Sequence, residues 1–523
     1  MKRDGFEKIE KMWIADQGDG TYTNPILYTD YSDPDAIRVG EDYFMIASSF
    51  CNTPGVPLLH SKDLVNWKVI NYICEKLPFE RYERPEHGCG TWAPAIRYHE
   101  GVYYVFIPFP DEGIMMSKTT DPWGEWSPLT YVRKVVGWID PCPFWDDDGK
   151  AYMVTAFARS RIGFKSMLYM SPIEPDCSGV LDDGQFIYDG HETQPTIEGP
   201  KLYKRNGYYY IFAPAGGVKP GWQTVLRSKN IYGPYEEKIV LHQGSTPVNG
   251  PHQGAWVDTP GGQDWFLHFQ DVGNAGRIVH LQPMHWVDDW PVIGVNEDEN
   301  GCGEPVLRYE KPDVGTVYPI DAPEDSDFFE EEKLGLQWQW NANYHKEWYE
   351  LKDGSLTLYA QPCTEGTQLC DVPNLLLQKW PAPEFQITTC LHLENMQEGD
   401  VAGMVSQCGH YTGLLVKKKN GKYILQQRIG TWTEKEEERK ADECKILGEI
   451  SGNTIYLKML VEKETYVSFK ISENGECYEK TGEVVEATPG RWVGVKVGLA
   501  AINEAEAYGG NVRADYFIFE KLA

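Results

Sequence analysis

Residues 31–47 read YSDPDAIRVGEDYFMIA. The turn-forming pair Asp33-Pro34 leads into an apolar run, a turn centred on Gly40 follows, and an aromatic run brings the chain back at 43–47. Two β-prone runs joined by a glycine turn predict a β-hairpin.

The hairpin pattern recurs four more times in the first part of the chain. The tight turns of the later copies fall at 100–101, 148–149, 206–207 and 261–262. The residues that open the five copies, in steps of 59, 48, 58 and 54, are Asp33, Trp92, Asp140, Glu198 and His252. A second run, SKDLVNW at 61–67, is echoed in each period, so each repeat holds two hairpins. Five all-β repeats of four strands predict a five-bladed β-propeller.

The opening residues indicate where the chemistry lies. Equivalent positions in a propeller occupy equivalent places around its axis, so all five are expected at one end of the central channel. Three carboxylates, an indole and an imidazole around one axis are typical of a site. An Asp before Pro is also an ordinary turn residue, which explains one copy easily. It explains the whole set poorly, because Glu198 is not a turn former.

The remainder of the chain has a different organisation. A length of 523 residues predicts at least two domains. The repeats place the propeller at 20–310, and an acidic, proline-bearing stretch at 311–326 reads as a linker. The fivefold repeat is absent after it, and alternating runs predict an antiparallel β-sandwich over 327–523 with one solvent-exposed face. These runs are 356–359, 385–389, 413–416, 423–426, 455–459, 466–471 and 516–519.

Composition limits the partners and the location. A net charge of −29 argues against nucleic acid and anionic membranes, since both need basic patches. No apolar run approaches the roughly 20 residues that span a bilayer. Residues 1–11 lack the apolar core of a secretory signal, so we expect a cytoplasmic protein. The twelve cysteines contain no CxxC pair, which argues against a zinc site and a disulfide framework and predicts reduced, buried thiols. The sequence leaves open whether the chain forms a homo-oligomer.

Several stretches of the first domain resemble glycoside hydrolase family 43. They are Asn24-Pro25 followed by Asp33-Pro34-Asp35, Trp92-Ala93-Pro94, Asp140-Pro141, Glu198-Gly199-Pro200-Lys201-Leu202-Tyr203, and Gly276-Arg277 with Trp286. The second domain resembles the concanavalin-like sandwich of the family's β-xylosidases. The resemblance implies an inverting glycosidase that releases terminal β-D-xylose or α-L-arabinofuranose from plant cell-wall oligosaccharides such as xylan fragments. It also implies that the sandwich lends an aromatic side chain to the pocket, although the sequence does not say which.

The resemblance assigns roles to three carboxylates. Asp33 matches the general base, Glu198 the general acid, and Asp140 the third carboxylate that tunes the pKa of the acid and helps to orient it. Inversion needs an ionised base and a protonated acid about 6.5–9.5 Å apart, so that a water molecule fits between base and sugar. A nearby negative charge keeps the acid protonated. Asp35 and Asp30 are rival bases, and Asp33 is preferred because it aligns with the other openings.

Four other residues match the family with alternatives that stay open. Trp92 matches a pocket tryptophan, although Trp is often a core residue, and Phe50 is a candidate wall. Arg277 matches a substrate-binding arginine, and its five donors suit sugar hydroxyls, although an interblade salt bridge is the alternative. His252 matches a channel histidine that in some members reaches a structural calcium ion. Calcium prefers oxygen ligands, so a purely structural histidine is an equal alternative. The chemistry itself needs no cofactor.

Two other functions are kept as alternatives. The five-bladed fructan and sucrose hydrolases are retaining enzymes with two Asp and one Glu, but their Asn-Asp-Pro-Asn and Glu-Cys signatures are missing. A non-catalytic, sugar-binding propeller would have no use for three carboxylates in register. Asp35 and Lys201 stand where some family members have Ser and His, and these two departures leave the choice of sugar undecided.

Overall fold

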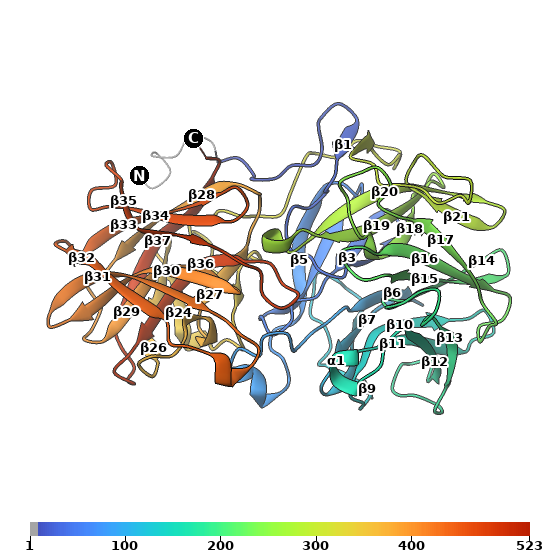
Figure 1. Cartoon of the computed structure of the whole chain (residues 1–523), viewed down its shortest axis with the longest axis horizontal. Helices are drawn as coiled ribbons and strands as arrows, with labels where there is room; N and C mark the ends of the chain where they lie inside the picture. Colours follow the sequence, from blue (N-terminus) through green and yellow to red (C-terminus); the bar gives the residue numbers. More distant parts are fainter. Residues whose placement is uncertain (1–8, 523) are drawn as a thin grey trace.

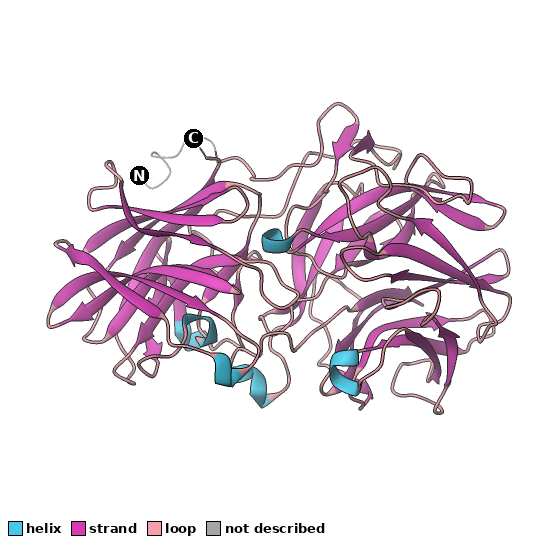
Figure 2. Ribbon diagram, in the orientation of Figure 1, coloured by secondary structure: helices cyan, strands magenta, loops and turns pink. Residues whose placement is uncertain are grey.

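The computed structural model describes residues 9–522, which form two all-β lobes. The propeller and the sandwich lie side by side, the propeller in blue to green and the sandwich in yellow to red (Figure 1). Strands make up nearly all of the regular structure (Figure 2). The predicted fold class is therefore confirmed. Residues 1–8, where most of the segment tested for a secretory signal lies, are outside the described residues. Within the described range, no helix is long and apolar enough to cross a membrane.

The first lobe consists of five four-stranded antiparallel blades whose strand order follows the chain. Blade 1 is β2 (Asp35–Val39), β3 (Asp42–Ile46), β4 (Gly55–Ser61) and β5 (Trp67–Cys74). Blade 2 is β6 (Ala95–His99), β7 (Val102–Phe109), β8 (Gly113–Thr119) and β9 (Thr130–Arg133). Blade 3 is β10 (Trp138–Trp145), β11 (Ala151–Phe157), β12 (Met167–Ile173) and β13 (Gln185–Asp189). Blade 4 is β14 (Lys201–Arg205), β15 (Tyr208–Ala215), β16 (Trp222–Ser228) and β17 (Glu236–Leu241). Blade 5 is β18 (His252–Asp258), β19 (Asp264–Asp271), β20 (Arg277–Val287) and β21 (Trp290–Ile293).

The second strand of each blade explains the aromatic runs in the sequence. In β3, Tyr43 and Met45 pack in the core shared with blade 5, whereas Phe44 packs in the core shared with blade 2. Both faces of the strand are therefore covered, because each blade is packed between two others. A strand buried on both faces needs a continuous apolar run instead of an alternating one.

The N-terminal segment closes the ring. Asn24 binds blade 5 through both ends of its amide: Nδ2 donates to the carbonyl oxygen of Leu281, and Oδ1 accepts from its N–H. Leu27 pairs with Val279 of β20. A two-stranded sheet of β1 (Thr21–Thr23) and β22 (Arg308–Glu310) lies outside the blades. Contacts that are remote in sequence thus hold the first and last blades together.

The second lobe is a sandwich of two mainly antiparallel sheets. One sheet contains, in spatial order, β23 (Gln339–Trp340), β27 (Leu376–Lys379), β36 (Lys496–Asn503), β29 (Asp400–Gln407), β30 (His410–Lys419), β31 (Lys422–Thr431) and β32 (Glu443–Ile450), with β26 (Gln361–Pro362) parallel to β36. The other contains β24 (Tyr349–Lys352), β25 (Ser355–Tyr359), β37 (Asn511–Glu520), β28 (Phe385–His392), β33 (Thr454–Glu462), β34 (Tyr466–Ser472) and β35 (Glu479–Glu486). The helical segments are short: η2 (Glu80–Glu83), α1 (Arg159–Ile162), η3 (Gly273–Ala275), η4 (Lys346–Trp348), η5 (Leu369–Asp371) and η6 (Glu436–Glu438).

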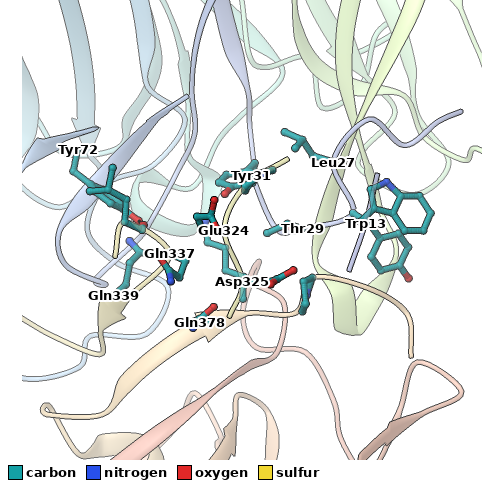
Figure 3. A pocket seen from close by; sticks show the side chains of 15 residues that line it. Trp13, Leu27, Thr29, Tyr31, Tyr72, Glu324, Asp325, Gln337, Gln339 and Gln378 are labelled. Carbon is teal, nitrogen blue, oxygen red and sulfur yellow. The ribbon is translucent and has the colours of Figure 1, made fainter. Parts of the chain in front are cut away.

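The segment predicted as a linker packs against the propeller. Lys311 Nζ lies 2.8 Å from Asp63 Oδ2 and also contacts Asp16, and the Asp321 N–H donates to Asn66 Oδ1 at 2.9 Å. A small crevice of about 40 Å³ lies at the boundary of the two lobes, where Tyr31 of the propeller faces the sandwich (Figure 3). The crevice contains none of the five opening residues.

The cysteines form no disulfide among the described residues, since all twelve are free. Most are buried, but Cys444 and Cys477 are exposed. The prediction of buried thiols is wrong for these two, because both lie on the solvent side of the sandwich.

Candidate active site

A cavity of about 310 Å³ opens at one end of the propeller channel. Four of the five opening residues line it, namely Asp33, Trp92, Asp140 and Glu198. Phe50 and Arg277 line it as well. The fifth opening residue, His252, lies behind Glu198, with its Nε2 3.2 Å from Glu198 Oε1. The volume is at the lower end of the roughly 300–1,000 Å³ typical of small-molecule sites, so the cavity suits one or two sugar rings.

Because the blades repeat, each of these carboxylates lies just before or within the first strand of its blade. Asp33 and Glu198 come two and three residues before β2 and β14, and Asp140 lies at a register shift within β10. Asp33 and Asp140 have positive φ values of 55° and 54°. Aspartate tolerates this left-handed conformation better than most residues, and non-glycine residues held in it are enriched at active sites. The shared conformation turns both carboxylates toward the axis in the same way.

Asp33 is held by three donors. Ser48 Oγ and Ser32 Oγ donate to its Oδ2 at 2.7 and 2.8 Å, and Arg277 Nη1 donates to its Oδ1 at 2.8 Å. Arg277 Nη1 also lies 2.9 Å from Ser32 Oγ. Charge-assisted hydrogen bonds of this length fix the carboxylate at the cavity wall. Arg277 is therefore an intramolecular partner of Asp33 that still faces the cavity.

The two rival bases are occupied elsewhere. Asp35 is fully buried and accepts hydrogen bonds from Arg97 Nη1 at 2.7 Å and from the Ile96 N–H at 2.8 Å. Asp30 accepts from the N–H groups of Arg277 and Gly494, both at 2.9 Å. Neither side chain lines the cavity. The geometry thus distinguishes Asp33 from Asp30 and Asp35.

Asp140 lies deepest in the cavity wall. It is 2% exposed and accepts a hydrogen bond from the Gly199 N–H at 2.7 Å. Burial, and then the neighbouring Glu198 carboxyl, raise the pKa of Asp140 to about 7, whereas the buried ammonium group of Lys201 opposes the increase. A carboxyl group with this raised pKa retains a proton near neutral pH, so Asp140 holds a proton next to Glu198.

Aromatic rings form the walls of the cavity. The Phe50 and Trp92 rings lie 6.3 Å apart, and the Arg161 guanidinium stacks 4.8 Å above the Trp92 ring. On the other side Trp92 meets Trp492 edge to face, with centroids 4.7 Å apart. Trp492 also lines the cavity and comes from the sandwich, in the loop before β36. It is the aromatic side chain from the sandwich that the family resemblance predicts without identifying the residue.

The loop that carries Trp492 is fastened to blade 5. The Gly494 N–H donates to Asp30, and Asn274 Nδ2 donates to the carbonyl oxygen of Ala487 at 3.0 Å. The Val495 N–H donates back to the carbonyl oxygen of Asn274 at 2.8 Å. A Cβ atom on Gly494 would lie 2.7 Å from the backbone nitrogen of Gly276, so only glycine permits this approach. The only sequence signal for the contact is an aromatic residue set between glycines at 490–494.

The arrangement combines an acceptor and a proton donor in one enclosed space. Asp33 is fixed on the Arg277 side, and Asp140, whose pKa is raised, lines the same cavity together with Glu198. Apolar rings flank both, which suits the faces of a sugar ring. This set of groups can activate a water molecule and protonate a leaving oxygen without a metal ion taking part.

Comparisons with known proteins show the family to which the two domains belong. The family described as "Glycosyl hydrolases family 43" matches residues 22–291, and "Beta xylosidase C-terminal Concanavalin A-like domain" matches residues 326–520. A Xylanibacter ruminicola relative named "Putative beta-xylosidase" is 41% identical over 95% of this chain and 89% of its own length. A Bacteroides ovatus relative named a non-reducing end alpha-L-arabinofuranosidase is 26% identical over 98% of this chain and 97% of its own. The solved structure of a bifunctional GH43-CE protein from Bacteroides eggerthii superposes with a TM-score of 0.82 at 29% identity; the match covers 96% of this chain and 64% of that longer one.

Proposed function

This chain belongs to glycosyl hydrolases family 43 and is a glycosidase, and from that premise we propose that Asp33, Asp140 and Glu198 catalyse hydrolysis with inversion at a terminal pentose. The observation that carries the proposal is the meeting of these three carboxyl groups in one aromatic-walled cavity. The substrate proposed is a β-D-xyloside, an α-L-arabinofuranoside or both, within oligosaccharides such as xylan fragments.

Asp33 is the proposed general base. A carboxylate fixed by Arg277 and two serine hydroxyls at the cavity wall is in position to take a proton from a water molecule. The water then attacks the anomeric carbon from the face opposite the leaving group, which inverts its configuration. Arg277 keeps Asp33 oriented and presents its remaining donors to the sugar hydroxyls.

Glu198 is the proposed general acid, with Asp140 as its partner. The Glu198 side chain is 23% exposed, whereas Asp140 is almost completely buried, so Glu198 is the member of the pair that can reach a glycosidic oxygen. Burial and the neighbouring Glu198 carboxyl raise the pKa of Asp140 to about 7, so a proton is held beside Glu198 near neutral pH. Transfer of this proton to the departing oxygen leaves the charge on the pair.

His252 is proposed to position Glu198. Its ring is 1% exposed, and its Nε2 lies 3.2 Å from Glu198 Oε1, without the alignment of a hydrogen bond. Its Nδ1 has no hydrogen-bond partner among the described residues. Calcium takes six to eight oxygen ligands, and a single imidazole beside a catalytic carboxyl offers a poor donor set for it. Calcium near His252 stays a prediction, and no step of the proposed reaction depends on it.

The pocket shape favours removal of single sugars from chain ends. The propeller alone would present a shallow mouth, and Trp492 of the sandwich adds a wall beside Trp92. A three-sided aromatic pocket suits one terminal ring better than the middle of a polymer. The names of the relatives, a xylosidase and an arabinofuranosidase, support the same two sugars.

Two variants test the catalytic roles. Asp33→Ala should abolish hydrolysis of every substrate, because no other group can activate the water. Glu198→Ala should reduce kcat strongly for xylobiose but much less for an activated nitrophenyl xyloside, since an activated group leaves with little protonation. Near wild-type turnover by Asp33→Ala would refute the assignment. A panel of nitrophenyl glycosides, assayed with the wild-type enzyme, decides the sugar.

A further inference from the structure

A cluster of three side chains on the outer face of the sandwich has no part in the glycosidase site. Cys390 and His392 lie two residues apart on β28, so they project from the same face of the sheet. Asp515 lies on the adjacent strand β37. The thiol, the imidazole and the carboxylate each offer one ligand atom, and these three atoms lie within 4.8 Å of one another.

A β-bulge brings Asp515 to this face. The pairing of β28 with β37 slips by one residue between Thr389 and Leu391, so Asp515 and Tyr516 both stand opposite Cys390 alone. The β37 residues before and after this pair both pack in the sandwich core. Asp515 and Tyr516 are therefore consecutive residues that both face outward. Bulges re-aim side chains in this way and are over-represented beside functional sites.

The three groups converge on a single atom of the imidazole. His392 Nε2 lies 2.9 Å from Asp515 Oδ2 and 3.9 Å from Cys390 Sγ. In a catalytic relay the nucleophile and the carboxylate bind opposite nitrogens of the ring, and here both approach Nε2. The geometry therefore does not suit a nucleophilic cysteine. It suits one cation at the point where the three ligand atoms meet.

The distances and the supporting contacts fit a transition-metal ion. Zinc lies about 2.3 Å from sulfur and about 2.0–2.2 Å from nitrogen and oxygen, so its tetrahedral ligands stand roughly 3.3–3.6 Å apart. The observed 2.9 and 3.9 Å bracket this range. His392 Nδ1 lies 3.3 Å from Thr454 Oγ1, and Ser355 Oγ donates to Asp515 Oδ1 at 3.4 Å. Such outer contacts orient metal ligands.

The surroundings are partly desolvated. Tyr456 stands opposite Cys390 on the adjacent strand β33, and the side chains of Tyr456, Tyr478 and Tyr516 are all half-buried. Low local polarity strengthens the attraction between a thiolate and a cation. A thiolate with imidazole and carboxylate ligands selects zinc-like ions over calcium or magnesium.

We propose that Cys390, His392 and Asp515 form a binding site for Zn²⁺ or a similar divalent transition-metal ion. The ion links β28 to β37 at the bulge and leaves a fourth position for water. The absence of a CxxC pair predicted that the chain has no zinc site. On a β-strand, however, residues two positions apart, such as Cys390 and His392, project from the same face of the sheet. A Cys-x-His pair is therefore a ligand pair that a search for CxxC overlooks.

A second cluster in the described part of the chain fits a metal less well. It consists of His87, Cys370 and Asp371 at the boundary of the two lobes. His87 Nε2 donates to the carbonyl oxygen of Cys370 at 3.0 Å, and Asp371 pairs with Arg439 at 3.2 Å. The ring nitrogen and the carboxylate are thus both engaged, and this cluster serves as an internal control.

The test is a Co²⁺ titration of the full-length protein after dialysis against a chelator. We expect one equivalent to bind with a thiolate-to-cobalt charge-transfer band in the near ultraviolet, and Zn²⁺ to displace it and raise Tm. Cys390→Ser should abolish the band, and Asp515→Asn should weaken binding at least tenfold. Thr454→Val should weaken it about tenfold, because it removes the hydroxyl that contacts His392 Nδ1 and orients the ring. The control variants Cys444→Ser and His87→Ala should bind as the wild type does.

Three results would overturn the site. They are the absence of stoichiometric cobalt binding, binding without a thiolate band, and a band that persists in Cys390→Ser. Loss of the band in His87→Ala would show that the metal binds at the cluster of His87, Cys370 and Asp371 instead. All variants should retain wild-type kcat/KM on nitrophenyl xyloside, which confirms folding and separates this test from that of the proposed glycosidase residues.

Discussion

Removal of the Trp492 indole tests whether the sandwich completes the active site. Trp492 is the lining residue that the sandwich contributes to the cavity, and it meets the Trp92 ring edge to face at 4.7 Å. Replacement by alanine opens the pocket on that side and leaves the three carboxyl groups in place. The expected effect is a loss of substrate binding energy with the chemistry retained.

The apolar area that a sugar buries and the contact between the two indole rings set the expected size of this loss. If a pentose buries roughly 50 Å² of apolar surface against the indole, at about 25 cal/mol per Å² the contact contributes about 1.3 kcal/mol. The Trp92–Trp492 contact adds about 0.5–1.5 kcal/mol, because Trp92 loses the neighbour that fixes its ring. The sum of about 1.8–2.8 kcal/mol corresponds to a fall in kcat/KM of about 20–100-fold.

The assay compares kcat/KM of Trp492→Ala, Trp492→Phe and the wild type on xylobiose and on nitrophenyl xyloside. Phenylalanine keeps a wall and should recover most of the activity. Trp432→Ala is the matched control, because Trp432 is also a sandwich tryptophan near the lobe boundary, where it contacts His87 and not the cavity. A loss below threefold for Trp492→Ala, or an equal loss for Trp432→Ala, would refute the reasoning.

Three further outcomes are expected. Asp30→Asn leaves only one acceptor for the N–H groups of Arg277 and Gly494, which should cost about 1–3 kcal/mol of unfolding free energy and at least tenfold in kcat/KM; equal Tm and activity would contradict it. Proton NMR of the first-formed sugar should show the anomer opposite to that of the substrate, and retention would contradict the role of Asp33. Asp140 has a folded pKa of about 7 against about 3.9 when unfolded, so its stabilising contribution is complete below pH about 4 and is lost as pH rises to 7. Asp140→Asn should therefore raise Tm relative to wild type more at pH 8 than at pH 5, and a difference independent of pH would count against it.

The repeat made most of the fold and much of the cavity predictable. Asp33, Asp140 and Glu198 occupy matching places in three blades, so alignment of the repeats alone brings them to one end of the channel. The same alignment preferred Asp33 over Asp35, which lies on the first strand of the blade and is paired with Arg97. Periodic features are readable from sequence because each copy confirms the position of the others.

Structural features that do not repeat along the chain could not be predicted from the sequence. Trp492 lies 199 residues after the end of blade 5 at Ile293, and the loop that carries it is fastened by the hydrogen bond from the Gly494 N–H to Asp30. The bulge at Asp515 is equally hidden, since one extra residue in β37 changes the face of a side chain without altering the composition of the strand. Both depend on register between distant segments, which a single sequence does not encode locally.

Asp30 connects these observations into one view of the site. Its two carboxylate oxygens bind the backbone of Arg277, which holds Asp33, and the backbone of Gly494, which follows Trp492 by two residues. The base and the sandwich wall are thus positioned by the same buried group. This coupling predicts that the effects of Asp30→Asn and Trp492→Ala do not add in the double variant, because both disturb the same wall of the pocket. Additive losses would show that Asp30 acts on Arg277 alone.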